Sequence, residues 1–152
     1  MQDKAKGDAI AGTKLFGALA TDRISEIAML AMPRSYFAEQ PVVQMGDDAD
    51  GLYVVVSGTA RVESLFAGSK KVVGQLTPGD VFGEVALLGG ADKRTATVIA
   101  ENDLQCLLLP LGPMKDLLQR HPEVREHLEA LGQRRTTTNL QLHLGELPEI
   151  ED

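Results

Sequence analysis

The chain has 152 residues, which is the size of one domain and enough to bury an independent core. Fifteen Lys and Arg residues stand against 22 Asp and Glu residues, and the resulting net charge of −7 argues against whole-surface attraction to nucleic acid or anionic membrane. Apolar runs such as 52–56 and 107–111 are too short to span a bilayer, and the N-terminus lacks a signal-peptide pattern. We therefore expect a cytoplasmic domain without membrane insertion. Cys106 is the only cysteine, which excludes an internal disulfide or a thiolate zinc cluster.

The segment 12–37 has the pattern of N-terminal helices. Thr21 can act as an N-cap and Asp22 suits the first helical turn, while Pro33 limits how far the helix continues. Apolar residues at helical spacing fall on one face, and these are Ile24, Ile27, Ala28 and Ala31.

Between residues 41 and 111, short apolar or β-branched runs alternate with glycines, nine of the 15 in the chain. Many short strands with closely spaced turns are typical of a sandwich or a closed barrel. The predicted strands are Pro41–Met45, Leu52–Ser57, Thr59–Phe66, Lys71–Leu76, Arg94–Ala100 and Leu104–Pro110.

A helical pattern returns over 112–135 and predicts two C-terminal helices, with Pro113 and Pro122 in first-turn positions. The tail, 136–152, is polar and ends acidic, so we expect it to be poorly ordered.

One predicted strand places a charge on an apolar face. Arg94 shares its face with Ala96 and Val98 if the strand alternates regularly. An unpaired guanidinium at the edge of the core is costly, so Arg94 requires an anion, either an internal carboxylate or a ligand.

The segment Phe82–Leu88 offers groups that complement a sugar phosphate. Gly83 lets a ligand approach the backbone, and the amides that follow can point at a phosphate. Glu84 is a good acceptor for a sugar hydroxyl, and Arg94 can form two-pronged bonds to phosphate oxygens.

The stretch Phe82–Val98, FGEVALLGGADKRTATV, resembles the phosphate-binding cassette of the cyclic nucleotide-binding domain family. That family includes catabolite activator proteins, kinase regulatory subunits and cyclic-nucleotide-gated channels. The resemblance extends to Met45–Val62 and Leu76–Glu84 and, near the N-terminus, to an LF…L pattern at Leu15, Phe16 and Leu19.

The resemblance implies a mainly β fold with flanking helices: an antiparallel eight-stranded jelly-roll barrel in 41–111, within a domain spanning 12–135. Its phosphate-binding cassette would be 82–95. Gly83, Val85 and Ala86 would offer backbone amides, Glu84 would bind the ribose 2′-hydroxyl and Arg94 the cyclic phosphate. Thr95 stands where the family carries a small or hydroxyl residue, and a threonine there is similar to domains that tolerate or prefer cGMP. Simple alternation, however, turns Thr95 away from the Arg94 face. Arg134 and Arg135 are the candidate residues of a lid over the purine.

Each assignment has a structural alternative. Arg94 could form an internal salt bridge, for instance with Glu84, and Glu84 could simply complement a helix dipole. Gly83 could be a turn glycine as well as a ligand contact. Arg134 and Arg135 could be a solvated helix end.

Two features of the sequence bear on how the domain would act on other molecules. Glu84 and Arg94 are ten positions apart, a spacing that resembles the bacterial transcription regulators. Those regulators continue into a helix-turn-helix, whereas 136–152 shows no such pattern, so we expect no direct contact with nucleic acid.

The resemblance thus implies a sensor module that binds cAMP or cGMP, moves its C-terminal helix and regulates a partner protein or an attached domain. No GxSxG, Walker A or HExxH motif is present, so neither an enzyme activity nor a metal or other cofactor is expected. The alternative function is a ligand-free scaffold domain of the same fold, and a DNA-binding regulator would require a further domain.

Overall fold

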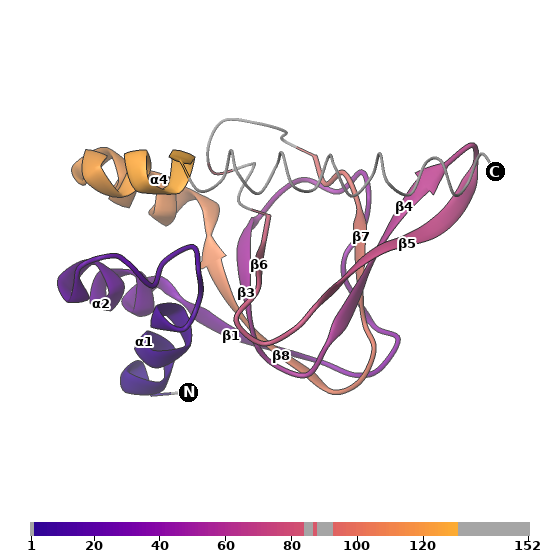
Figure 1. Ribbon diagram of the computed structural model, residues 1–152, viewed down its shortest axis with the longest axis horizontal. Coiled ribbons are helices and arrows are strands. Elements are labelled where there is room, and N and C mark those ends of the chain that lie inside the picture. The colour runs from indigo at the N-terminus through magenta and orange to yellow at the C-terminus, as the bar shows by residue number, and fades with distance from the viewer. Residues whose placement is uncertain (1, 84–86, 88–92, 131–152) are drawn as a thin grey trace.

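The computed structural model describes residues 2–83, 87 and 93–130, and of Phe66 it describes the main chain only. The described chain is mainly β, with two four-stranded antiparallel sheets. Figure 1 shows the helices gathered at one side of the sheets.

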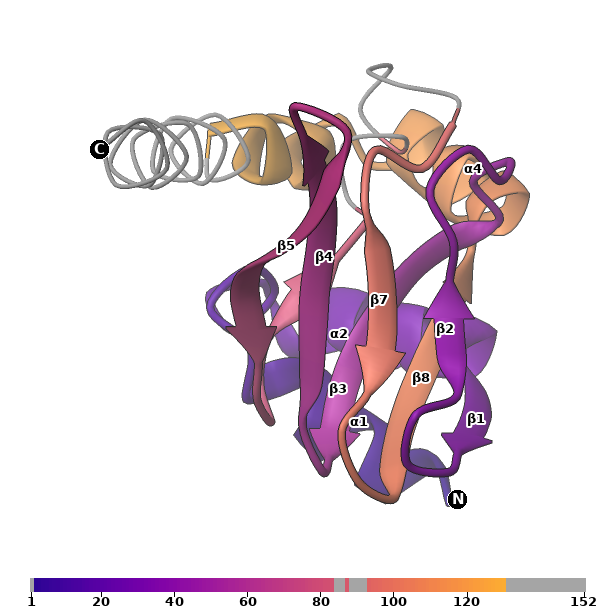
Figure 2. The same ribbon diagram turned by 90° about the vertical axis from the view of Figure 1, so that its right-hand side faces the viewer.

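The first sheet has the strand order β1-β8-β3-β6, and every described pair in it is antiparallel. Its strands are β1 (Met32–Tyr36), β3 (Gly51–Ser57), β6 (Val81–Phe82) and β8 (Leu104–Pro110). The second sheet has the order β2-β7-β4-β5, and Figure 2 shows its strands side by side in front of β3 and β8. Its strands are β2 (Pro41–Val43), β4 (Ala60–Phe66), β5 (Ser69–Leu76) and β7 (Thr97–Ala100).

Strands β3 and β8 are buried on both faces, which is why their sequences are almost continuously apolar. Because side chains alternate along a strand, each face belongs to a different core. The helix-side core receives Leu52, Val54, Leu107 and Leu109. The core between the sheets receives Tyr53, Val55, Cys106 and Leu108.

The described helices are α1 (Asp3–Ala11), α2 (Thr21–Leu30) and α4 (Leu111–Arg120), and residues 122–130 are also helical. The helical prediction for 12–37 is wrong after Leu30, because Met32–Tyr36 pairs with β8 as an edge strand. Pro33 is tolerated there because the outer edge needs no N–H donor. Thr21 is the first helical residue rather than the N-cap, which is Ala20. Helix α1 ends at Ala11 and so lies before the range 12–37 in which N-terminal helices were expected.

Each of the six predicted β segments contains a strand, so the prediction of a mainly β antiparallel domain is confirmed. Arg94 precedes β7, which begins at Thr97, although the burial of Val98 agrees with the expected face. The closed jelly-roll barrel stays a prediction, because the described strands hydrogen-bond within two separate sheets.

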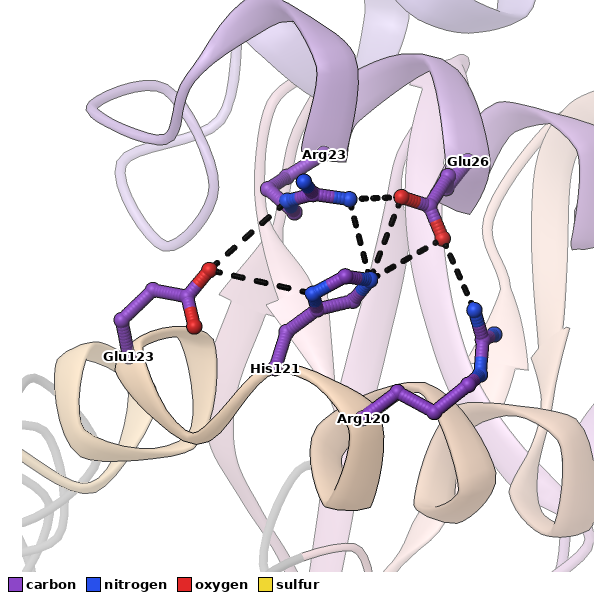
Figure 3. A network of polar contacts seen from close by, with 5 residues as sticks. All are labelled: Arg23, Glu26, Arg120, His121 and Glu123. Carbon is purple, nitrogen blue, oxygen red and sulfur yellow. Dashed lines mark hydrogen bonds and ion pairs between the residues drawn. The ribbon is translucent and has the colours of Figure 1, made fainter.

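A polar network joins α2 to the junction between α4 and the helical residues 122–130 (Figure 3). Glu26 of α2 accepts hydrogen bonds from Arg23 and, at 3.2 Å, from Nη1 of Arg120. His121 lies between them, with its Nε2 2.9 Å from Nη1 of Arg23 and 3.2 Å from Oε1 of Glu26. Glu123 extends the network, with its Oε2 3.7 Å from Nε of Arg23. Helix α2 and the helical residues after β8 are therefore connected by charge as well as by apolar contact.

Within the described ranges, no helix is long and apolar enough to cross a membrane. The same residues contain no group of three or more His, Cys, Asp or Glu side chains arranged to hold a metal ion.

Replacing Glu26 by Gln should lower the free energy of unfolding by about 1 kcal/mol, because several partly covered contacts between helices lose their charge together. The matched control is Glu129→Gln, which removes a pair with Arg125 within one helical segment and should cost only about 0.3–0.5 kcal/mol. Urea unfolding monitored by circular dichroism measures both changes. Equal losses in the two variants would contradict a role for Glu26 in joining the helices.

Cys106 generates a prediction about alkaline stability. Burial raises the pKa of its thiol to about 12, from an ordinary value of 9.0. Above pH 9 the unfolded chain loses this proton while the folded chain keeps it, so the free energy of unfolding should fall as pH rises toward 12. At pH 10 the fall due to this thiol is about 1.4 kcal/mol relative to pH 8. Urea unfolding at the two pH values should therefore show a smaller fall in the free energy of unfolding for Cys106→Ala than for wild type. Identical falls in the two proteins would contradict the raised pKa of this thiol.

Candidate functional site

The site is centred on Arg94, whose main chain is fixed before β7 begins. Its N–H donates to the carbonyl of Asp47 at 2.8 Å, and its carbonyl accepts from the N–H of Gly46 at 2.9 Å. The neighbouring Lys93 pairs with Asp48. These contacts fix the Arg94 backbone against the loop that follows β2. They therefore also fix the point from which the Arg94 side chain extends into the protein.

The guanidinium of Arg94 is buried, and the whole residue is only 8% exposed. Its Nη2 donates to Oδ1 of Asp50 and to the carbonyl of Gly51, each at 2.7 Å. Its Nε is also buried but has no hydrogen-bond partner in the part of the chain that the structure describes. A buried donor without an acceptor is costly, so this nitrogen is suited to an additional acceptor.

Gly83 makes room for this guanidinium. It follows β6 with a φ of 90°, in the left-handed region that favours glycine. A Cβ at this position would lie 2.5 Å from Nη1 of Arg94 and 2.9 Å from the carbonyl oxygen of Gly51. A side chain here would therefore collide with the arginine and with the backbone of β3.

Tyr53 and Asp50 support the guanidinium from β3 and the residue before it. The Tyr53 hydroxyl donates to Oδ2 of Asp50 at 2.9 Å, and the Tyr53 ring centroid lies 5.7 Å from Cζ of Arg94. The ring stacks on Phe82 of β6, with centroids 4.9 Å apart and an interplanar angle of 4°. Burial, followed by the hydrogen bond to Asp50, raises the pKa of Tyr53, so its hydroxyl remains a donor at physiological pH.

The chemistry of this arrangement is anion binding. An arginine is a planar donor fork that matches phosphate oxygens. Here it is held by one carboxylate, one carbonyl and one aromatic ring, and it retains a buried donor without an acceptor.

The structure brings together two of the residues singled out from the sequence, Gly83 and Arg94. Thr95 is exposed, as expected from its turning away from the Arg94 face. Glu84, Val85, Ala86, Arg134 and Arg135 lie outside the described residues, so their roles stay predictions.

Asp50 and Tyr53 are site residues that the sequence did not single out. The sequence suggested Glu84 as an acidic partner for Arg94. The described partner is Asp50, 44 positions away along the chain. Tyr53 carried a weak signal, because it is the one polar group in the buried run Leu52–Val55.

Known proteins resemble this chain in both sequence and structure. The family model for the cyclic nucleotide-binding domain matches residues 33–121. A cAMP-dependent protein kinase regulatory subunit from Mucor circinelloides f. lusitanicus is 41% identical over 101 residues, which cover 61% of this chain and 23% of the relative. A cyclic AMP receptor protein from Thermus thermophilus is 32% identical over 125 residues, covering 82% of this chain and 57% of the relative.

A solved structure of cAMP-bound PfPKA-R superposes with a TM-score of 0.80 at 25% identity. It matches 96% of this chain and 47% of that chain. The present chain thus spans between about a quarter and three fifths of the length of these relatives.

Gly83→Ala should displace Arg94 and lower the free energy of unfolding by about 1–3 kcal/mol, because the new methyl group meets the guanidinium and the backbone is held at positive φ. Gly74→Ala in β5 is the matched control, since a Cβ there meets nothing within 4 Å. Thermal and urea unfolding of both variants measures the difference. A Gly83→Ala protein as stable as the Gly74→Ala protein would contradict the close approach.

Proposed function

Because the chain belongs to the cyclic nucleotide-binding domain family, we propose that it binds a 3′,5′-cyclic nucleotide, cAMP or cGMP, and that Arg94 binds the cyclic phosphate. The observation that carries this proposal is the buried guanidinium beside Gly83 with a donor nitrogen that lacks an acceptor. A phosphate oxygen at Nε would remove the cost of that unsatisfied donor, about 1–3 kcal/mol, and add a charge-assisted hydrogen bond.

The other ligand contacts follow from the family pattern and are part of the proposal. The backbone amides of Gly83, Val85 and Ala86 bind phosphate oxygens, and Glu84 accepts from the ribose 2′-hydroxyl. Thr95 contributes to the choice between cAMP and cGMP. Arg134 and Arg135 cover the purine in a closed state.

The proposed output is a shift between two conformations. Ligand binding orders the cassette and draws the C-terminal helix over the base, which presents a different face to a partner protein or an attached domain. In this proposal the module is non-catalytic and needs neither a metal nor another cofactor. It works in the cytoplasm without direct contact to nucleic acid. The closed jelly-roll barrel belongs to the same proposal.

A second candidate function is a ligand-free interaction domain of the same fold. One observation favours it: Arg94 already has an internal carboxylate partner, Asp50, and a carbonyl partner, Gly51. An arginine retained only for structure needs partners of this kind.

Isothermal titration of nucleotide-stripped protein with cAMP and with cGMP separates the two functions. Dissociation constants in the micromolar range or tighter support the sensor. The names of the relatives make cAMP the first ligand to test. The ratio of the two affinities, measured again on Thr95→Ala, tests the role of Thr95. A folded protein that binds neither nucleotide favours the ligand-free domain.

Arg94→Ala should weaken cyclic nucleotide binding by roughly 10- to 150-fold, which corresponds to the loss of about 1.5–3 kcal/mol from a charged hydrogen bond. Arg94→Lys keeps the charge without the planar fork and should bind with intermediate affinity. Arg34→Ala is the control, because Arg34 is an exposed residue of β1. Wild-type affinity in both Arg94 variants, with the fold intact by circular dichroism, would rule out the phosphate role.

A further inference from the structure

We propose that Asp50 makes the phosphate site selective for ligands with a single negative charge, so that a cyclic phosphodiester is preferred over a phosphate monoester such as 5′-AMP. This inference rests on the proposed function, because it requires Arg94 to bind the phosphate of a nucleotide. It adds a specificity-determining residue that contacts Arg94.

Asp50 neutralises most of the charge that Arg94 would offer. Its Oδ1 lies 2.7 Å from Nη2 of Arg94, so the two groups together carry no net charge. The adjacent basic residue, Lys93, is exposed and pairs with its own aspartate, Asp48. Arg94 is the cation that the structure places directly against Gly83.

The same contacts determine which guanidinium nitrogens remain for a ligand. Nη2 carries two hydrogens, and Asp50 and the carbonyl of Gly51 accept both. The ligand is therefore left with Nη1 and the buried Nε. The Nε–H lies on the edge of the guanidinium that it shares with Nη2, and it can donate to one unesterified oxygen of a phosphodiester, whose two such oxygens share one charge.

Asp50 cannot simply turn away when an anion arrives. Its Oδ2 accepts from the hydroxyl of Tyr53, a buried residue that stacks on Phe82. Its backbone carbonyl accepts from the N–H of Leu111 at 3.0 Å. Both the side chain and the main chain of Asp50 are held, so its negative charge stays close to a bound phosphate.

This fixed charge acts differently on the two classes of phosphate. A phosphate monoester has a second pKa near 6 and carries almost two charges at pH 7, whereas a diester carries one. Like charges about 7 Å apart, at an effective dielectric constant of roughly 20–40, repel by an amount equal to roughly 7- to 50-fold in affinity. We expect about tenfold, because Asp50 is partly exposed to water.

Asp50→Asn tests the charge alone. The amide can still accept from Arg94 and exchange a hydrogen bond with Tyr53, so the geometry is preserved. The probes are cAMP, 5′-AMP and the methyl ester of 5′-AMP, each measured by displacement titration at pH 7.5. The methyl ester is an acyclic diester with one charge, which separates charge from ring shape.

The expected result is that Asp50→Asn improves the affinity for 5′-AMP about tenfold relative to the affinity for its methyl ester. Asp48→Asn removes the same charge from the same loop without contacting Arg94, and it should leave that ratio within about twofold of wild type. Tyr53→Phe keeps the carboxylate but releases it from its anchor, and it should shift the ratio in the same direction by a smaller factor.

Equal changes for 5′-AMP and its methyl ester would overturn the proposal, because Asp50 would then only position Arg94. So would a failure of both acyclic ligands to displace cAMP from wild type and variant at millimolar concentration, since ring shape would then decide. Failure of wild type to bind cAMP or cGMP at all would instead refute the proposed function.

Discussion

The burial of one guanidinium is the constraint on which this site depends. A charge such as that of Arg94 is stable inside a protein only where acceptors surround it. The acceptors come from Asp50 and Gly51 at the start of β3, an aromatic face comes from Tyr53, and space comes from Gly83 after β6. The order of the strands brings these groups together, because β3 pairs with β6 and the Arg94 backbone is fixed to the loop after β2.

Strand β3 connects the site to the helices, because its two faces are buried in different cores. Tyr53 faces the core between the sheets, where it meets Phe82 and Arg94. Its neighbours Leu52 and Val54 face the helices. The strand that supports the guanidinium is therefore also the strand against which the helices pack. Residues 51–55 of this strand are buried, so side chains on both of its faces belong to a core.

The strands and two of the described site residues, Gly83 and Arg94, could be predicted from the sequence. Alternation and glycine spacing are local, so the six β segments between residues 41 and 110 and the unusual face of Arg94 could be recognised. The partner of Arg94 could not, because a pair 44 positions apart depends on which strands become neighbours. Met32–Tyr36 was missed for the same reason: its residues are mostly exposed, and only pairing with β8 makes them a strand.

The hydrogen bonds of Asp50 connect the site to the helices by a short route. Its carboxylate binds Arg94, while its carbonyl accepts from the N–H of Leu111, the first residue of α4. The other end of α4 is joined to α2 through Arg120 and His121, which both contact Glu26. Contacts of this kind transmit a signal only where the helices have two alternative arrangements. The described contacts therefore run without a break from Arg94 through Asp50 and α4 to α2.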